Sequence, residues 1–401
     1  MRHSHKLFII LCMTGTALST PASAEDVPPA VRVLLDSIER QTDIEPDYES
    51  IETADDGSIT ISKLSLNKPA AGGEPSATMR IDELVLSDIS DDGDGTYEIG
   101  SAEFTNINGD VSGEKFSITY EIPEMNAEDW YLVDADDNPT PQDALVANST
   151  LVRKVVAGKM TVAAMGQTFT VDGFQSDWDG DPETGAGTSA MKISNIAIPE
   201  QAVAMIDQTG MLRQLGYKSL NFDIESNSKV EIADGNIDMS ANASFSGRDI
   251  GAFKLGLAAD GIPLAIYSEL QSARQGGKQP DPAALLAQAQ GITLSDFSVR
   301  FEDASITAKL LPILAAMQGV DEAALIANAG AMAQMGLMQL QNQAFSEQTV
   351  AALNAFLKEP KSLSVTANPA APLKVSDLMA MNPAAPGEII TKLGLTVSAN
   401  D

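Results

Sequence analysis

The sequence contains one cysteine and two histidines, and all three lie within the first twelve residues (His3, His5 and Cys12). The rest of the chain offers no thiolate or imidazole. It therefore lacks the side chains of Ser-His-Asp and Cys-His nucleophile chemistry and of the usual zinc, haem and iron–sulfur ligand sets. Aromatic residues make up only 5% of the chain, so we expect a core of Ile, Leu, Val, Met and Ala.

Basic residues are also scarce, with 25 Lys and Arg against 56 Asp and Glu and a formal net charge of -31. Such a chain repels nucleic acid and anionic head groups over most of its surface, so we expect no nucleic-acid partner. We interpret the acidic residues as solvated faces that keep the protein soluble. A surface for divalent ions or a cationic partner is the alternative.

The first 24 residues have the layout of an export signal. A basic start at Arg2 and Lys6 precedes an apolar stretch over residues 7–18 and the small-residue triplet Ala22-Ser23-Ala24. We predict cleavage after the triplet and a periplasmic mature protein without a transmembrane segment. The apolar stretch is shorter than the roughly 20 residues of a spanning helix, so a retained anchor is the weaker alternative. Lipidation at Cys12 is disfavoured because Leu11 precedes it.

The clearest positive signal is strand-like alternation with a one-residue slip. It occurs in four segments: ISKLSL (61–66), IDELVL (81–86), ISNIAI (193–198) and LSDFSVRF (294–301). Alternation marks a half-buried strand, and one inserted residue is what a bulge needs to keep apolar side chains on one face. We therefore predict bent strands that each have one apolar and one polar face.

Other segments complete an expected fold class of mainly β with α (α+β), an elongated and curved antiparallel sheet with a helical C-terminal section. Further strands are predicted at 97–107, 115–122, 159–171, 219–226, 229–246, 250–258 and 305–309, with turns that include Asn108-Gly109 and Asp234-Gly235. Helices are predicted at 27–41, 141–157, 199–215, 321–341 and 346–357, with Ser346 as a helix cap and 361–366 as the last strand.

Composition suggests three regions after the export signal. Residues 25–273 form the antiparallel β-rich region with short helices, and residues 274–282 (RQGGKQPDP) form a hinge or loop. Residues 283–401 are richer in Ala, Met, Leu and Gln, and form a mixed α/β region with a helical pair.

Two motifs raise the possibility of metal binding. Asp177, Asp179 and Asp181 are spaced as in a calcium loop, but the sixth and twelfth positions are Pro182 and Thr188, where an EF-hand needs Gly and a bidentate acid. We interpret the segment as an acidic hairpin turn. Three methionines at helical spacing, Met332, Met335 and Met338, could hold Cu(I) but are more typical of adaptable packing or of a face for a greasy ligand. We expect no metal and no cofactor.

Catalysis is disfavoured. Paired carboxylates hydrolyse glycosides, but with 56 acidic residues some pair always lies at a suitable separation. Neither a convincing S-x-x-K segment nor a Gly-rich phosphate loop after a strand is present. We expect a protein without enzymatic activity, with a carboxylate-based hydrolase as the less favoured alternative.

The slipped segments at 193 and 294, together with residues 352–375 (ALNAFLKEPKSLSVTANPAAPLKV), resemble exported proteins of uncharacterised function from Gram-negative bacteria of the alphaproteobacterial type. More distantly, the chain is similar to the AsmA-like envelope proteins. That resemblance implies a long curved β-groove linked to outer-membrane lipid balance. AsmA-like proteins usually keep an N-terminal membrane anchor, whereas the signal here is predicted to be removed.

Repeated one-sided strands produce a continuous apolar face, which offers a trough for acyl chains unless helices cover it. We therefore expect a non-catalytic periplasmic envelope protein that binds lipid or another hydrophobic ligand. The alternative is a structural or interaction scaffold with a sealed core, an acidic surface and envelope-protein partners. The candidate lining residues, each of which is equally a candidate core residue, are Ile81, Leu84, Leu86, Ile193, Ile196, Ile198, Leu294, Phe297 and Val299.

Overall fold

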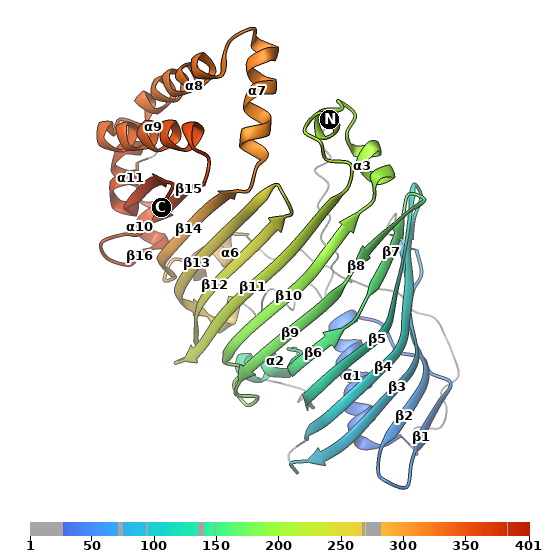
Figure 1. The fold of residues 1–401 in the computed structure, drawn as a ribbon. Coiled ribbons are helices and arrows are strands. Elements are labelled where there is room, and N and C mark those ends of the chain that lie inside the picture. Colours follow the sequence, from blue (N-terminus) through green and yellow to red (C-terminus); the bar gives the residue numbers. More distant parts are fainter. Residues whose placement is uncertain are drawn as a thin grey trace. The chain divides into compact units, whose positions relative to one another are not determined.

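The computed structural model of the protein describes residues 27–70, 75–93, 95–134, 140–147, 149–266, 269, 282–382 and 384–401 (Figure 1). The predicted export signal and nearly all of the predicted hinge lie outside these residues. The chain divides into two compact units: unit 1 is Met1–Pro139 with Val146–Thr168, and unit 2 is Thr140–Leu145 with Phe169–Asp401. The strands below pair antiparallel and, among the described residues, most of the helical ones follow residue 300, which confirms the predicted mainly β with α class.

Unit 1 is a meander packed against one helix. Its elements are α1 (Pro29–Thr42), β1 (Ser50–Thr53), β2 (Ile59–Lys68), β3 (Ser76–Asp91), β4 (Thr96–Gly113), β5 (Phe116–Val133), β6 (Leu151–Ala157) and β7 (Met160–Ala164). Strands β1 to β5 pair in sequence order, and β5 also pairs with β6 and β7. Helix α2 (Pro141–Ala147) and strand β8 (Gln167–Val171) cross the boundary between the units.

Helix α1 covers the apolar face of this meander, as its sequence pattern predicts. Pro29 stands in the first turn, where its missing N–H costs no hydrogen bond. Val31 and Leu34 are three residues apart, so they share one helix face, and both are fully buried. They pack with Ile61, Leu84 and other strand residues in one cluster. The core of unit 1 therefore lies between α1 and the sheet.

The predicted slip in β2 is present as a bend that the neighbouring strands share. Lys63 has φ 55° and Asn106 of β4 has φ 52°, both in the left-handed region. On either side of the bend the register between β2 and β3 is the same, with Ser62 opposite Glu83 and Leu64 opposite Ile81. Each strand thus carries one extra residue at the same level, which keeps the apolar side chains of every strand on one face.

Unit 2 is a second, larger meander with helices at its C-terminal end. Its strands are β9 (Gly173–Gly180), β10 (Gly187–Ile198), β11 (Leu220–Ala233), β12 (Asn236–Gly247), β13 (Gly251–Pro263), β14 (Thr293–Asp303), β15 (Ser362–Ala367), β16 (Leu373–Lys374) and β17 (Leu395–Ala399). Its helices are α3 (Glu200–Ile206), α4 (Met211–Gln214), α6 (Pro282–Ala289), α7 (Ile306–Gln318), α8 (Glu322–Leu337), η1 (Met338–Leu340), α9 (Gln343–Lys358), α10 (Val375–Met379) and α11 (Pro386–Leu393).

The strands of unit 2 pair in the order β9 to β15 and then β17, with β16 beside the start of β14. Both slips predicted here are bulges. The β10–β11 register shifts between Ile193 and Ile196, where Asn195 has φ 50°. The β13–β14 register shifts where Ala258 and Ala259 face Asp296 and Leu294.

Two element predictions were wrong in type. Residues 141–157 form not one helix but the short α2 followed by β6, since the valine-rich end of the segment pairs with β5. Residues 305–309 begin α7 rather than form a strand. The Thr307 amide donates to the Asp303 carboxylate at 2.8 Å, and Ile306 packs against the buried cluster that contains Val203. This capping and long-range packing outweigh the strand preference of the β-branched residues.

Three local predictions were also wrong. Helix α9 begins at Gln343 and is capped by Asn342, whose side chain accepts from the Phe345 amide at 3.0 Å, so Ser346 lies inside the helix. Strand 361–366 is not the last one, because β16, two helices and β17 follow it. Asn108-Gly109 is not a turn but lies within β4. A Cβ at Gly109 would come within 2.5 Å of the Tyr120 hydroxyl, so the glycine serves close packing.

Candidate functional site

The register of unit 2 separates apolar and polar side chains onto opposite faces. Phe253 of β13 lies between Phe245 of β12 and Phe301 of β14. Its neighbour Lys254 points to the other face, where its partner across β13–β14 is Arg300. Strands β13 and β14 therefore carry one apolar and one polar face, as the alternation predicts, whereas Ser226 and Ser228 of β11 lie on the same side as Phe245.

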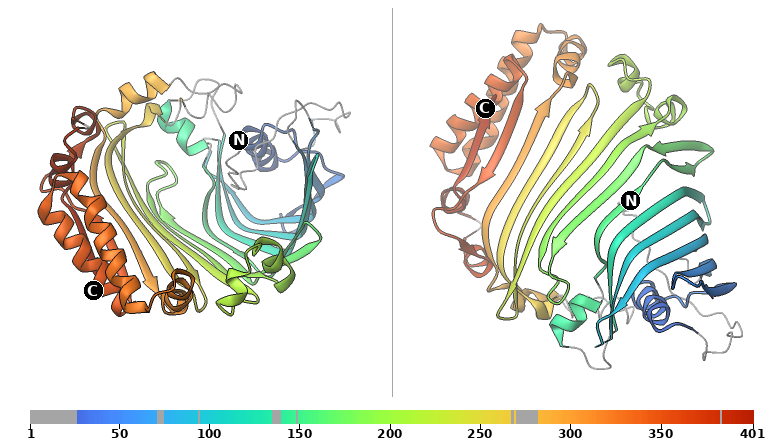
Figure 2. Two further views of the ribbon diagram at one scale, coloured as in Figure 1. Left: turned by 90° about the horizontal axis from the view of Figure 1, so that it is seen from above. Right: turned by 60° about the horizontal axis from the view of Figure 1, so that its bottom comes forward.

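Helices cover the apolar face at two places. The cluster around Val203 of α3 packs against Ile198 of β10 and Phe222 of β11, and α9 covers the last strands. Figure 2 shows the orange and red C-terminal helices along one side of these strands. Phe356 of α9 is 6% exposed and meets the ring of Phe301 edge-on, with ring centroids 6.1 Å apart and planes at 74°. Val397 of β17 is buried as well. Here the sheet and α9 form an ordinary sealed core.

The apolar face of β12 to β14 beyond this cover is exposed. Five large apolar side chains there, which we call the apolar strip, are Phe245 (44% exposed), Phe253 (43%), Leu255 (42%), Leu257 (40%) and Phe297 (36%). They are contiguous, because Phe245 faces Phe253 and Leu257 faces Phe297 across the strand pairs. Exposed apolar side chains are ordinary singly, whereas a contiguous group marks a ligand or partner surface.

Three of the nine predicted lining residues lie in unit 1. Ile81, Leu84 and Leu86 are at most 4% exposed and belong to the cluster that packs against α1. These three residues are therefore part of a sealed core.

The other six predicted residues lie in unit 2. Ile193, Ile196 and Ile198 are half-buried, and Ile198 packs against the cluster that contains Val203 of α3. Leu294 and Val299 of β14 are half-buried too, and Val299 lies opposite Leu255 of the apolar strip.

Phe297 is the one predicted residue that belongs to the apolar strip. Sequence reasoning missed its other four members, Phe245, Phe253, Leu255 and Leu257. The signal was present in the run FKLGL (253–257), where alternate positions are large and apolar. This run has no slip, so the slipped alternation that predicts the other lining residues does not identify it.

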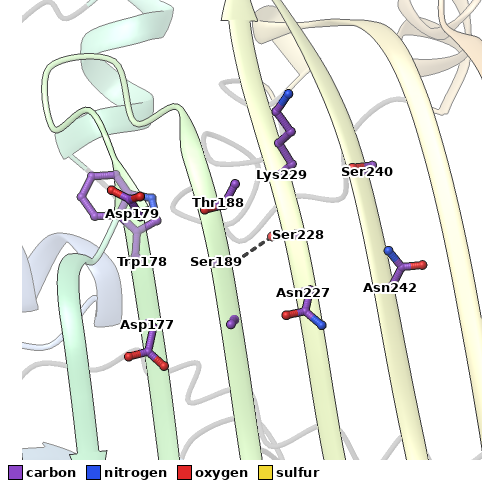
Figure 3. A pocket seen from close by; sticks show the side chains of 11 residues that line it. Asp177, Trp178, Asp179, Thr188, Ser189, Asn227, Ser228, Lys229, Ser240 and Asn242 are labelled. Atoms are coloured by element: carbon purple, nitrogen blue, oxygen red, sulfur yellow. Dashed lines mark hydrogen bonds between the residues drawn. The ribbon is translucent and has the colours of Figure 1, made fainter.

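A shallow depression of about 390 Å³ lies over β9 to β12 (Figure 3). Its lining is mostly polar, and the labelled side chains are Asp177, Trp178, Asp179, Thr188, Ser189, Asn227, Ser228, Lys229, Ser240 and Asn242. Several of these groups already bond within the protein. The hydroxyls of Ser189 and Ser228 are 2.7 Å apart, and Lys229 pairs with Glu231 at 2.6 Å. Trp178 and Ala190 are the apolar residues of this lining, whereas most small-molecule sites are lined predominantly by apolar and aromatic side chains.

The segment considered for calcium is an acidic hairpin turn between β9 and β10, as predicted. The Asp181 carboxylate accepts from the Glu183 amide at 2.9 Å and from the Thr184 hydroxyl at 3.0 Å. Asp177 lies within β9 and accepts from the Gln175 side chain at 2.7 Å. Among the described residues, no three Asp, Glu, His or Cys side chains are placed to hold a metal ion.

Charged residues on the polar face of β14 form a network with Asp401. Arg300 donates to the Asp401 carboxylate at 2.7 Å and to Glu302 at 3.0 Å, and Lys254 pairs with Glu302 at 2.7 Å. Hydrogen bonds from Ser398 and then Arg300 lower the pKa of Asp401 to about 2. The network ties β14 to the end of β17 by charge-assisted bonds and leaves these carboxylates ionised.

Three methionines of the C-terminal helices are not packed in the core, so of the two alternatives for them adaptable packing is wrong, and a face for a greasy ligand stays a prediction. Met332, Met335 and Met338 are 68%, 60% and 66% exposed. Within the described ranges, every helix taken singly is too short or too polar to cross a bilayer. Helix α7 and the α8–η1 segment reach that length and hydropathy only together, and they are bent by 89° at the break between them.

A family model described as "Uncharacterized protein" matches residues 244–400, which is less than half of the chain. A search of curated protein sequences finds no match. The matched segment runs from the end of β12 through β17, and so contains the whole apolar strip together with helix α9 that covers its neighbouring strands.

Proposed function

We propose that this chain is an exported, non-catalytic protein of the periplasm that binds an acyl chain or another elongated apolar ligand on the apolar strip of unit 2. The observation that carries the proposal is the set of five contiguous apolar side chains, each 36–44% exposed, on one face of β12 to β14. The export signal predicted for residues 1–24 and the scarcity of thiol and imidazole groups support the location and the non-catalytic role.

The shape of the strip favours a chain-like ligand. Phe253, Leu255 and Leu257 follow one another at every second position of β13, which spans roughly 13 Å along the strand. Phe245 and Phe297 widen the strip on either side by one strand spacing each, about 4.8 Å. The strip is therefore longer than it is wide and has no polar side chain of its own. The binding free energy of a ligand on this strip comes mainly from removing apolar surface from water.

Binding of a fluorescent fatty acid tests the proposal. We expect the double substitution Phe253→Ser and Leu257→Ser to weaken binding by about tenfold or more, because each side chain contributes on the order of 1 kcal/mol when partly covered. Phe116→Ser is the matched control, since Phe116 is 45% exposed but lies on β5 in unit 1. Equal affinity of the double variant and the original protein would rule out the strip as the site.

Native mass spectrometry distinguishes this function from the scaffold alternative. Protein purified from its own host without detergent should carry lipid that the double variant lacks. A clean apo mass for the original protein would instead favour a scaffold, in which another protein covers the strip and the acidic surface meets partners.

A further inference from the structure

We propose that the exposed methionine face of the α8–η1 segment, formed by Met332 and Met335 of α8 and Met338 of η1, docks onto the surface of a lipid bilayer with zwitterionic head groups. This inference concerns a different surface from the apolar strip. It goes beyond the proposed function and does not depend on it.

The methionine face continues an apolar helix face that is covered at one end only. Leu325 and Met332 are seven residues apart, or about two turns, so they lie on the same side of α8. Leu325 packs with Leu311 and Ala315 of α7, whereas Met332 is 68% exposed. Figure 1 shows α7 rising from the end of β14 and α8 running back toward α9. The cover that α7 gives to the start of α8 thus ends before the methionines.

The opposite side of α8 is held by α9. A Cβ at Gly330 would lie 2.7 Å from the Asn354 side-chain oxygen, so the two helices approach closely at this glycine. Met332 and Met335 lie roughly 200° and 140° around the helix from Gly330. Met332 and Met335 therefore project away from α9, and docking on this side leaves the packing of α8 on α9 intact. Met338 lies roughly 80° from Gly330 and borders the depression between α8 and α9, so it stands at the edge of the methionine face.

The distribution of charged residues along the chain indicates which kind of bilayer the methionine face binds. No charged residue occurs from Ala323 to Ser346, although 20% of the chain is charged. Each acidic or basic side chain placed in the hydrocarbon region of a bilayer would cost several kcal/mol. The segment from Ala323 to Ser346 has no such side chain. The rest of the chain, with its net charge of -31, repels anionic head groups. A zwitterionic bilayer is therefore the surface that both features fit.

The geometry favours lying on the bilayer over crossing it. The segments α7 and α8–η1 have the length and hydropathy of a span only when taken together, and the 89° bend between them prevents one straight passage. Unbranched methionine side chains adapt to an irregular surface. Shallow insertion of Met332 and Met335, with Met338 at the edge of the contact and the helix axis in the plane of the interface, is the arrangement that remains.

Flotation with phosphatidylcholine vesicles tests the proposal on the full chain. The substitutions Met332→Gln, Met335→Gln and Met338→Gln together keep the side-chain length and the helix propensity. We expect them to lower vesicle partitioning by at least about tenfold. The matched control is Met165→Gln in the turn between β7 and β8, where the methionine is 67% exposed. Residues 7–18 are the same in all variants, so any vesicle binding by this apolar stretch is common to the proteins that are compared.

Oxidation gives a second measurement that does not depend on a variant. Dilute peroxide converts exposed methionines to sulfoxides, and vesicles should protect Met332 and Met335 several-fold while Met165 reacts at an unchanged rate. Adding phosphatidylglycerol at low salt should weaken binding.

Three results would overturn the docking proposal: equal partitioning of the triple variant, binding that requires anionic lipid, and self-association of the free protein that the triple variant loses. The last would show that a second copy covers the face. Fatty-acid binding at the apolar strip is measured separately, so failure of either proposal leaves the other standing.

Discussion

Phe253 and Phe301 lie directly opposite each other in β13 and β14. The part of the sheet that helix α9 covers ends between these two residues. Phe301 is half-buried against Phe356 of α9, whereas Phe253 is 43% exposed. Two neighbouring side chains of the same type on the same face thus differ in whether a helix from another part of the chain lies over them. This boundary separates the sealed core of unit 2 from the apolar strip.

Removing the ring at the end of the cover should destabilise unit 2 and extend its exposed apolar surface. We expect Phe356→Ala to lower the free energy of unfolding by about 3–5 kcal/mol, because Phe356 is 6% exposed and contacts Phe301. Urea unfolding followed by the fluorescence of Trp178 in β9 measures this change. Binding of an apolar dye to the folded variant should rise. An unchanged unfolding midpoint would show that α9 does not seal this face.

Leu84 should behave as a core residue rather than as a ligand contact. It is fully buried in the cluster beneath α1, so Leu84→Ala should cost about 2–5 kcal/mol of stability. Phe116→Ala, at a position 45% exposed in the same unit, should change stability by no more than about 0.5 kcal/mol. Trp130 of β5 reports the unfolding of unit 1 in both variants. Equal effects of the two substitutions would contradict the assignment of Leu84 to the core.

The bend in β2 should prefer glycine at Lys63. This residue is exposed and has φ 55°, a conformation that costs an L-residue about 1–2 kcal/mol and glycine almost nothing. Lys63→Gly should therefore raise the melting temperature or leave it unchanged, whereas Lys63→Val should lower it by several degrees. If Lys63→Val matched the original protein, the left-handed backbone at this bend would be disproved.

The pairing of Arg300 with Asp401 should contribute stability that depends on pH. Because the pKa of Asp401 is lowered to about 2 in the folded protein, the contribution is present above the unfolded value near 4 and is lost as pH falls through about 2. Asp401→Asn should lower the melting temperature at pH 6, and its difference from the original protein should shrink as pH falls from 4 to 2. Asp377→Asn, on α10 outside this network, serves as the control. A constant difference across that range would exclude an ionised Asp401 as the cause.

Local features were predictable because they depend on near neighbours in the chain. The alternation around Ile193 and Ile196, with one inserted residue, was enough to predict a bulge at Asn195. Helix α1 was predicted from its prolines and the spacing of its apolar residues. The predictions that failed, such as the helix over 141–157 and the strand over 305–309, concern segments whose structure depends on distant partners: β5 in the first case and the cluster around Val203 in the second.

The sequence by itself determined the chemistry that is available, the antiparallel class and the existence of one apolar face on each strand, because composition and alternation are properties of the chain alone. Only the tertiary structure decided which apolar residues are covered. Leu84 and Leu257 are both leucines on the apolar face of a strand, yet α1 lies over the first and no described helix buries the second. Burial is set by the packing of segments far apart in sequence, and local periodicity contains no information about that packing.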